Sequence, residues 1–263
     1  EDSIRYGFAR DVSVMVFFGF GFLMSYLRRY GLSALGFTLC IGAFTIQQSI
    51  LWEFLILYDT EWTGKRIKFM NMIDALFCAA SIMVAFGIVI GKLTPYQVLF
   101  MAFFQTIFYW INYRLNLVDN GAHDMGGSMV IHVFGTYFGL AVTWWVTPKE
   151  AIDHLEHTPD YVSDRLSIAG TLFLWIMYPS FNAAEASLAG GVTRALINTV
   201  LSLCGCVIGF AIMSRVLTRN KFSPVHLQNA SLAGGVGIGA IADLPVEEKF
   251  PQRKFSGTYI SPG

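Results

Sequence analysis

The sequence predicts an all-α polytopic membrane protein, and three observations carry this prediction. Hydrophobic residues make up 54% of the chain and charged residues only 14%, whereas soluble domains carry about 25% charged residues. The apolar residues occur in runs of roughly 20, the length of helix that crosses a bilayer core. The charged residues fall between these runs and do not form the polar stripes found on helices of soluble proteins.

Seven apolar runs qualify as membrane-spanning helices, and an eighth run, less apolar and rich in small residues, is a candidate. Helices are the expected form, because backbone groups in lipid must be hydrogen-bonded within the segment itself. Short polar linkers bound the runs: residues 59–68 and 116–124 on one side of the membrane, and residues 92–95 and 148–164 on the other. In chain order the runs cover residues 12–27, 34–57, 72–90, 96–115, 128–146, 166–184 and 192–217, and the candidate covers residues 225–242.

These runs define one transmembrane domain over residues 11–243, preceded by a polar flank at residues 1–10. Residues 244–263 carry charges and three prolines without periodicity, which predicts a disordered tail. Lys and Arg are divided almost equally between the two sides of the membrane. The positive-inside rule therefore does not orient the chain.

The composition also excludes several classes of function. The chain has 18 basic and 18 acidic residues. This balance gives no net basic charge of the kind that predicts a nucleic-acid partner. All four cysteines lie inside apolar runs, where they are expected to act as small apolar side chains, not as a disulfide framework or a zinc site. The sequence contains no motif for binding a cofactor and no motif of an intramembrane enzyme. It therefore predicts neither a bound cofactor nor an enzymatic activity.

Small residues recur at the spacing that lets two membrane helices approach closely. The three pairs of this kind are Gly87 and Gly91, Gly135 and Gly139, and Gly205 and Gly209. Several helix faces lined by small residues are more typical of a compact bundle of several spans than of a single-pass receptor. A seven-span receptor fits the number of helices, but no motif supports it.

His132 is the most informative polar residue, because it lies about one turn inside the run at residues 128–146. Ionisable groups within membrane helices are costly and often functional. A neutral imidazole offers one donor and one acceptor to a small polar solute. The alternative is a structural histidine that is hydrogen-bonded to a neighbouring helix.

Asp124 precedes the same helix, in Asp124-Met-Gly-Gly-Ser128. A carboxylate there caps free N–H groups and favours the positive end of the helix dipole. The alternative is that it faces a pore mouth and attracts a cation. Four further polar residues, Asp74, Asn112, Asn182 and Glu185, lie close to the ends of runs, where water is expected to satisfy them.

Several strings in the chain resemble the Rh glycoprotein and ammonium transporter family, Rh type. The similarity runs from Asp11 to about Ala242. The strings are Asp11-Val-Ser-Val-Met-Val-Phe-Phe-Gly-Phe-Gly-Phe-Leu-Met, Asp124-Met-Gly-Gly-Ser-Met-Val-Ile-His132 with Phe-Gly-Thr-Tyr-Phe-Gly-Leu after it, Gly170-Thr-Leu-Phe-Leu-Trp with Pro179-Ser-Phe-Asn182, Arg194-Ala-Leu-Ile-Asn-Thr, and His226-Leu-Gln-Asn-Ala-Ser-Leu-Ala-Gly-Gly-Val236.

The resemblance implies a channel fold of 11–12 helices built from two inverted repeats, of which this chain would hold the first half and the start of the second. It further implies conduction of ammonia after ammonium loses a proton at the outer mouth, a plasma-membrane location, and a homotrimer or a heterotrimer with Rh homologues. His132 would be the first of two pore histidines. Phe77 and Phe181 would be the stacked gate, and Asp124 the acidic residue before the pore helix.

A second hypothesis is a non-conducting Rh-related scaffold or trimer subunit. The resemblance places the partner of His132 in the second repeat, beyond about Ala242. The retained His132, Phe77 and Phe181 favour the channel, whereas the missing repeat favours the scaffold. A half-bundle would leave a polar pore wall exposed and would need a partner.

Overall fold

The computed structural model describes residues 2–29, 31–57, 66–147, 158–186, 190–217 and 223–245, and within these ranges it is helical and contains no strand. Short π-helical or 3-10 segments, labelled η, interrupt or extend several α-helices. In chain order the elements are α1 (Asp2–Val14), η1 (Met15–Gly19), α2 (Phe20–Leu23), η2 (Met24–Tyr26), α3 (Gly31–Leu57), α4 (Phe69–Val89), α5 (Pro95–Tyr113), η3 (Arg114–Asp119), η4 (Ser128–Val133), α6 (Phe134–Val146), α7 (Tyr161–Ala183), α8 (Gly191–Leu217) and α9 (Pro224–Gly239).

All eight predicted runs form helices, and their ends differ from the prediction by a few residues. The largest difference is at the start, where α1 begins at Asp2 and runs through η1 and α2 without a break. The polar flank is therefore the first part of a helix, and the side chain of Arg5 in it donates a hydrogen bond to the carbonyl of Ala184 at 2.7 Å. The predicted tail lies outside the described residues from position 246 onward.

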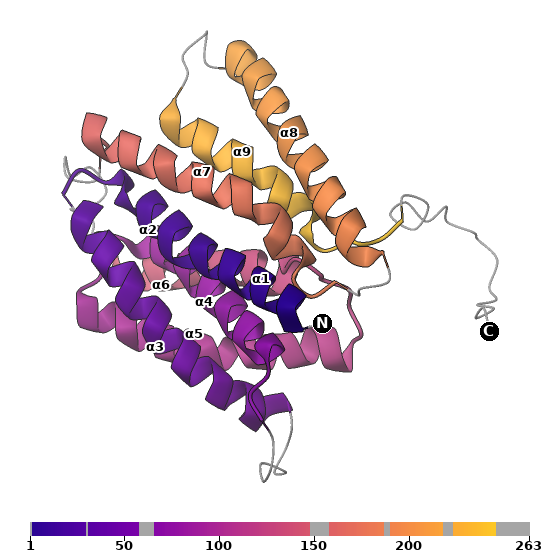
Figure 1. The fold of residues 1–263 in the computed structure, drawn as a ribbon. Helices are drawn as coiled ribbons and strands as arrows, with labels where there is room; N and C mark the ends of the chain where they lie inside the picture. Colours follow the sequence, from indigo (N-terminus) through magenta and orange to yellow (C-terminus); the bar gives the residue numbers. More distant parts are fainter. Residues whose placement is uncertain are drawn as a thin grey trace.

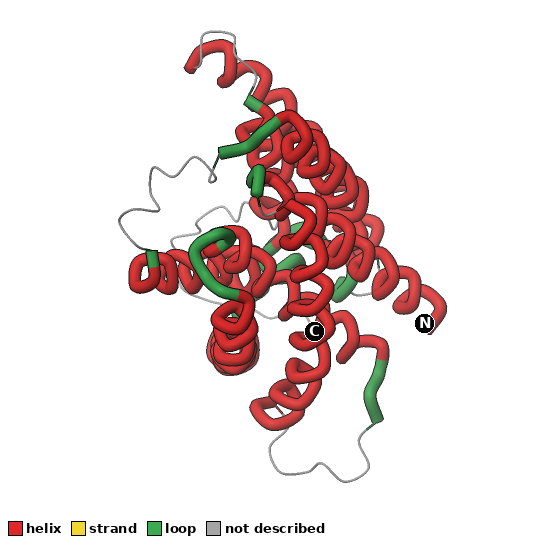
Figure 2. The backbone as a smooth tube through the Cα atoms, turned by 90° about the vertical axis from the view of Figure 1, so that its left-hand side faces the viewer, coloured by secondary structure: helices red, strands yellow, loops and turns green. Residues whose placement is uncertain are grey.

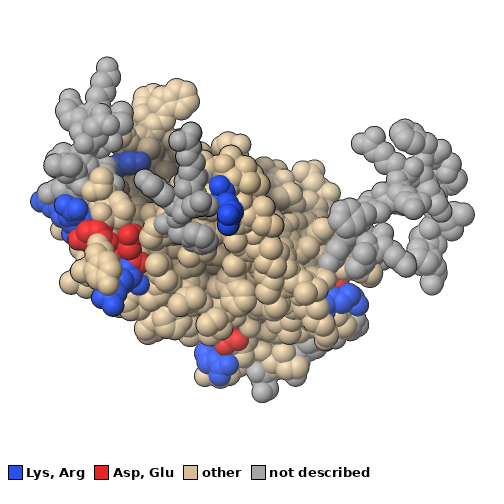
Figure 3. All heavy atoms as spheres, turned by 90° about the horizontal axis from the view of Figure 1, so that it is seen from above, with Lys and Arg blue, Asp and Glu red and all other residues tan. Residues whose placement is uncertain are grey.

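Five helices are long and apolar enough to cross a membrane: Ile4–Tyr26, Gly31–Leu57, Phe69–Val89, Ser128–Val146 and Gly191–Leu217. The other three predicted runs are helical but do not reach that standard. In α9 only 16 residues are helical, α7 carries Asp164 and Arg165, and α5 contains two glutamines and three tyrosines. The face of the molecule in Figure 3 shows charged side chains in only a few small groups, with uncharged surface between them.

Helix α4 lies at the centre of one half of the bundle, in contact with α1, α3, α5 and α6. Its close contact with α6 depends on two glycines. A Cβ atom on Gly135 would lie 2.6 Å from the carbonyl oxygen of Ser81, and one on Gly139 would lie 2.9 Å from Cα of Ala85. Both distances are too short for a side chain, so this small-residue pair is an interface, as its spacing predicts. Around Gly205 and Gly209 the described residues leave open space.

Helix α7 joins this half to α8 and α9, because it packs against α1, α2, α8 and α9. The tube view shows the helices packed side by side, with helices and loops but no strand among the described residues (Figure 2). Two contacts define the ends of the bundle. At one end Arg28 N donates to Thr158 O at 3.2 Å, and at the other Arg5 contacts Ala184. We call these the Arg28 end and the Arg5 end.

Candidate functional site: a gated apolar pore

The two phenylalanines assigned to a gate lie against each other between α4 and α7. The ring centroids of Phe77 and Phe181 are 4.4 Å apart, and the rings are inclined by 36°. Both side chains are buried. Helix packing thus brings together two residues far apart in the sequence, in a contact with the spacing of a favourable aromatic pair.

His132 lies next to this pair, on η4 at the start of the helix that continues as α6. Its ring centroid is 6.1 Å from that of Phe181, and only 9% of its surface is exposed. One ring nitrogen, Nε2, is 2.9 Å from the hydroxyl of Tyr178. Tyr178, which no sequence pattern indicated, lies about one turn before Phe181 on α7 and fixes the orientation of the imidazole.

A cavity of about 420 Å³ adjoins His132 and Tyr178. It is bounded by residues of η1, α2, α4, η4, α7 and α9, and most of the lining is apolar. The lining residues are Met15, Phe20, Val84, His132, Leu174, Tyr178, Asn229, Leu232, Ala233, Val236 and Gly237. An apolar chamber with a few hydrogen-bonding groups suits a small neutral polar solute, and it is costly for an ion to enter.

Asp124 holds the start of the histidine helix. Its Oδ2 accepts hydrogen bonds from the backbone N–H groups of Met129 at 2.8 Å and Val130 at 2.9 Å. This is the cap expected at a helix N-terminus. The turn before it depends on Gly127, whose φ of +66° favours glycine. Burial raises the pKa of the Asp124 carboxyl, and the hydrogen bonds from the helix N–H groups oppose that rise.

Replacing Asp124 with alanine is expected to destabilise the protein by about 1–2 kcal/mol, because two N–H groups at the helix start would lose their acceptor. Thermal unfolding of the purified protein in detergent measures the effect. Asp119→Ala is the matched control, because Asp119 is exposed and ends the preceding π-helical segment. Equal unfolding temperatures for the two variants would contradict the capping role.

Asn182 corrects one expectation from the sequence. Its position near the end of a run predicted contact with water, yet the side chain is fully buried. The Nδ2 group donates to Thr199 Oγ1 at 3.1 Å and to Gly235 O at 3.0 Å. The reason is that α8 and α9 cover this end of α7. Asn182 therefore links three helices directly beside Phe181.

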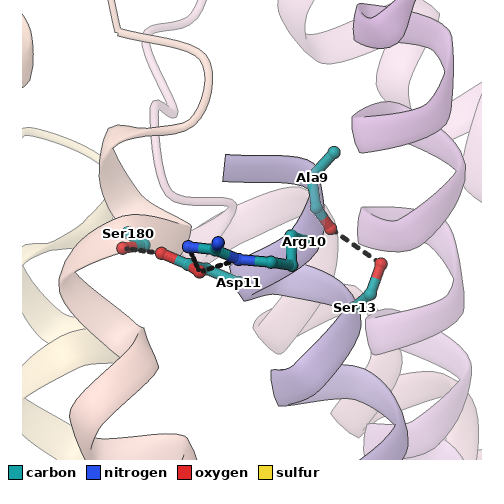
Figure 4. A network of polar contacts seen from close by, with 5 residues as sticks. All are labelled: Ala9, Arg10, Asp11, Ser13 and Ser180. Carbon is teal, nitrogen blue, oxygen red and sulfur yellow. Dashed lines mark hydrogen bonds and ion pairs between the residues drawn. The ribbon is translucent and has the colours of Figure 1, made fainter. Parts of the chain in front are cut away.

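The other neighbour of Phe181, Ser180, is fixed to α1. Figure 4 shows Asp11 between Ser180 and Arg10, with one carboxylate oxygen directed to each. Ser180 Oγ donates to Asp11 Oδ2 at 2.9 Å, and Arg10 Nη2 lies 3.1 Å from Asp11 Oδ1. Ser180 and Asn182, on either side of Phe181, thus fix this part of α7 to α1 and to α8 and α9.

The chain is similar to known membrane proteins over most of its length. The sequence model of the Ammonium Transporter Family matches residues 6–245. Rhesus-like glycoprotein A of Dictyostelium discoideum is 41% identical over 250 residues, which are 92% of this chain and 47% of that protein. Ammonium transporter Rh type C of Bos taurus is 44% identical over 247 residues, 92% of this chain and 53% of that protein. The chain spans about half the length of the curated relatives it matches.

Solved structures give the same result for the fold. The Rh50 structure of Nitrosomonas europaea superposes with a TM-score of 0.85 at 32% identity, covering 93% of this chain and 65% of that one. Mep2 of Saccharomyces cerevisiae superposes with a TM-score of 0.76 at 20% identity, covering 92% of this chain and 62% of that one. The described helices are thus arranged as part of this channel fold.

Proposed function

Because the chain belongs to the Ammonium Transporter Family, we propose that the protein conducts ammonia across a membrane by the route of the Rh type. The observation that carries this proposal is the contact of the Phe77–Phe181 pair with His132, beside an apolar cavity. Ammonium would arrive at the Arg5 end, lose a proton there, and cross as the neutral molecule. No catalytic conversion of a substrate is part of the proposal.

The physical basis is selection by charge. A cation in the apolar interior of a membrane protein costs several kcal/mol or more, while a small neutral molecule costs little. Potassium is excluded by the same barrier, since it has no proton to lose. The cavity beside His132 and Tyr178 offers hydrogen bonds to ammonia on an otherwise apolar path.

Each residue of the site has a proposed role in this path. Phe77 and Phe181 would close the entrance and attract ammonium by cation–π interaction, worth about 0.5–2 kcal/mol. His132 would exchange hydrogen bonds with ammonia below them. Asp124 would shape the pore helix through its cap, which its two backbone hydrogen bonds support.

A growth and uptake assay tests the function. Cells that lack their own ammonium transporters, expressing the protein from its complete gene, are expected to take up methylammonium and to grow on limiting ammonium. Expression of a Phe77→Leu, Phe181→Leu double variant, which changes the gate, is the matched comparison. Uptake no greater than in cells carrying an empty vector, despite protein in the membrane, would overturn the proposal.

The scaffold alternative is not favoured. The relatives at 44% identity are ammonium transporters of Rh type, and the residues proposed for conduction lie together. A scaffold needs none of these contacts.

We also propose that the protein lies in the plasma membrane and assembles as a trimer, with itself or with Rh homologues. The lipid-facing character of the surface is consistent with a multi-pass protein: Trp144 and Trp145 near the end of α6 are 89% and 90% exposed, as in an aromatic belt. The trimer rests on the resemblance alone. Surface labelling of intact cells and the mass of the detergent-extracted complex test the two statements.

A further inference from the structure

Two carboxyl groups lie next to the phenylalanine gate, on the side of the Arg5 end. Asp74 precedes Phe77 by three residues on α4, and Glu185 follows Phe181 by four residues just beyond the end of α7. Side chains three or four positions apart share a helix face. Because the rings of Phe77 and Phe181 are in contact, the two carboxyl groups meet about one turn away from them.

The two groups form a pair. The carboxyl groups of Asp74 and Glu185 lie within hydrogen-bonding reach of each other, and two carboxyl groups that share a hydrogen bond hold one proton between them. Both side chains are partly exposed, although most of each is surrounded by protein. The sequence predicted that water would satisfy each of them separately. Packing of α7 against α1 and of α1 against α4 instead places them together.

Charged and titratable groups of α1, α3, α5 and the segment before η4 act on the pair. Arg5 on α1 provides a positive charge that acts on both carboxyl groups, and it is fixed by its hydrogen bond to Ala184 O. Glu53 on α3 and Asp124 before η4 add negative charge at Glu185. Tyr109 on α5 is also within electrostatic reach. Asp124 and Glu53 thus add negative charge around a pair at which Arg5 provides the positive charge, and an excess of negative charge favours a cation.

Glu53 gives independent evidence that the cluster of carboxyl groups lacks an N–H donor. Its side chain is 1% exposed. Oε1 accepts a hydrogen bond from Asn71 Nδ2 at 2.5 Å, while Oε2 has no hydrogen-bond partner among the described residues. Asn71 lies one turn before Asp74 on α4. A buried acceptor without a donor is costly, and a cation that donates N–H groups would relieve that cost.

We propose that Asp74 and Glu185 form the binding and proton-accepting site for ammonium at the mouth of the pore, supported by Glu53. This inference rests on the proposed function. In the step, one N–H bond of ammonium breaks and its electron pair stays on nitrogen. The proton bonds to a carboxylate oxygen of the pair. Neutral ammonia passes between the phenylalanines, and the carboxyl group returns its proton to water at the Arg5 end.

The acidity of Glu185 suits this role. Burial raises the pKa of its carboxyl to about 7, with the charges of Asp124 and Glu53 acting in the same direction and the Asp74 hydrogen bond and Arg5 opposing them. A base is most effective when its pKa is close to the working pH. Because the proton acceptor is the ionised form, its contribution to flux rises as the pH increases through about 7.

Flux measurements on the protein expressed from its complete gene test the site. Liposomes carrying Asp74→Asn, Glu185→Gln or both are compared with wild type at equal total ammonium. The flux through the double variant is expected to fall about 100-fold or more, which is within the range of about 10²–10⁴ for a positioned base. The ratio of wild-type flux to variant flux should increase as the pH rises through about 7. Glu185→Asp, which keeps an ionisable group, should recover part of the loss.

Asp119→Asn is the matched control, because Asp119 is exposed and follows α5 in the linker that leads to Asp124. If the wild type conducts and the double variant conducts equally well, the inference is overturned and the proposed function stands. A protein that does not conduct would overturn the proposed function instead.

Ammonium binding gives a second measurement that does not depend on conduction. A ligand that binds only the folded state raises the unfolding temperature. Ammonium chloride should therefore stabilise the wild type more than tetramethylammonium chloride, which has no N–H donor, and this difference should vanish in the double variant. Equal stabilisation of wild type and double variant would contradict the site whether or not the protein conducts.

Discussion

Replacing His132 with leucine is expected to lower ammonia flux by about 2- to 10-fold. Tyr178 engages one ring nitrogen of His132, so the imidazole offers its other nitrogen to the solute on a path whose lining is mostly apolar. A hydrogen bond contributes about 0.5–1.5 kcal/mol, and about 1.4 kcal/mol corresponds to a factor of ten in rate. Leucine fills the space and does not supply this bond. Stopped-flow measurement of ammonia entry into liposomes gives the ratio.

Two further variants make this result specific. His226→Leu is the control, because His226 is exposed near the start of α9, away from the cavity lining. It should conduct as the wild type does. Tyr178→Phe removes only the partner of His132 at 2.9 Å, so it should reduce flux less than His132→Leu. If His132→Leu and His226→Leu conduct equally, His132 has no part in conduction.

The largest effect on stability is expected at Gly170. A Cβ atom there would lie 2.2 Å from the backbone nitrogen of Leu23 and 2.7 Å from the carbonyl oxygen of Gly19. Neither atom belongs to a side chain that can turn away, so α7 would have to separate from α2. We expect Gly170→Ala to cost at least about 1–3 kcal/mol, the usual range for overpacking, and Gly170→Val to prevent stable folding.

Gly205→Ala provides the matched comparison. Gly205 lies within α8, where no described atom comes within 4 Å of the added Cβ. Alanine is preferred over glycine in a helix by about 1 kcal/mol, so this variant should be as stable as wild type or slightly more stable. Chemical unfolding in detergent gives both free energies. Similar stabilities for Gly170→Ala and Gly205→Ala would show that α7 and α2 do not pack as described.

Much of this fold was predictable from the sequence because the membrane imposes strong constraints. An apolar run of about 20 residues has few alternatives to a helix, and all eight runs are helical. The Gly135–Gly139 pair also predicted an interface correctly. The same spacing at Gly205 and Gly209 predicted one that the described residues do not contain. Spacing alone does not identify the partner of a helix face.

The site was less predictable, because its parts meet only through tertiary packing. Phe77 and Phe181 are two of 23 phenylalanines, and only the resemblance distinguished them. Tyr178 is one of 11 tyrosines, and its contact with His132 depends on how α7 lies against η4. Asp74 and Glu185 had a clearer signal, since each is one turn from a gate residue. That spacing became informative only once the two rings were known to touch.

The most direct test of the central claim is the internal pH of liposomes that contain the complete protein, recorded after mixing with ammonium chloride. Entry of neutral ammonia consumes protons inside, so we predict an alkalinisation faster than in bare liposomes, with no dependence on an imposed membrane potential. An alkalinisation no faster than in bare liposomes would contradict the account. So would an electrogenic entry that follows the potential, because it would mean that the cation itself crosses the pore.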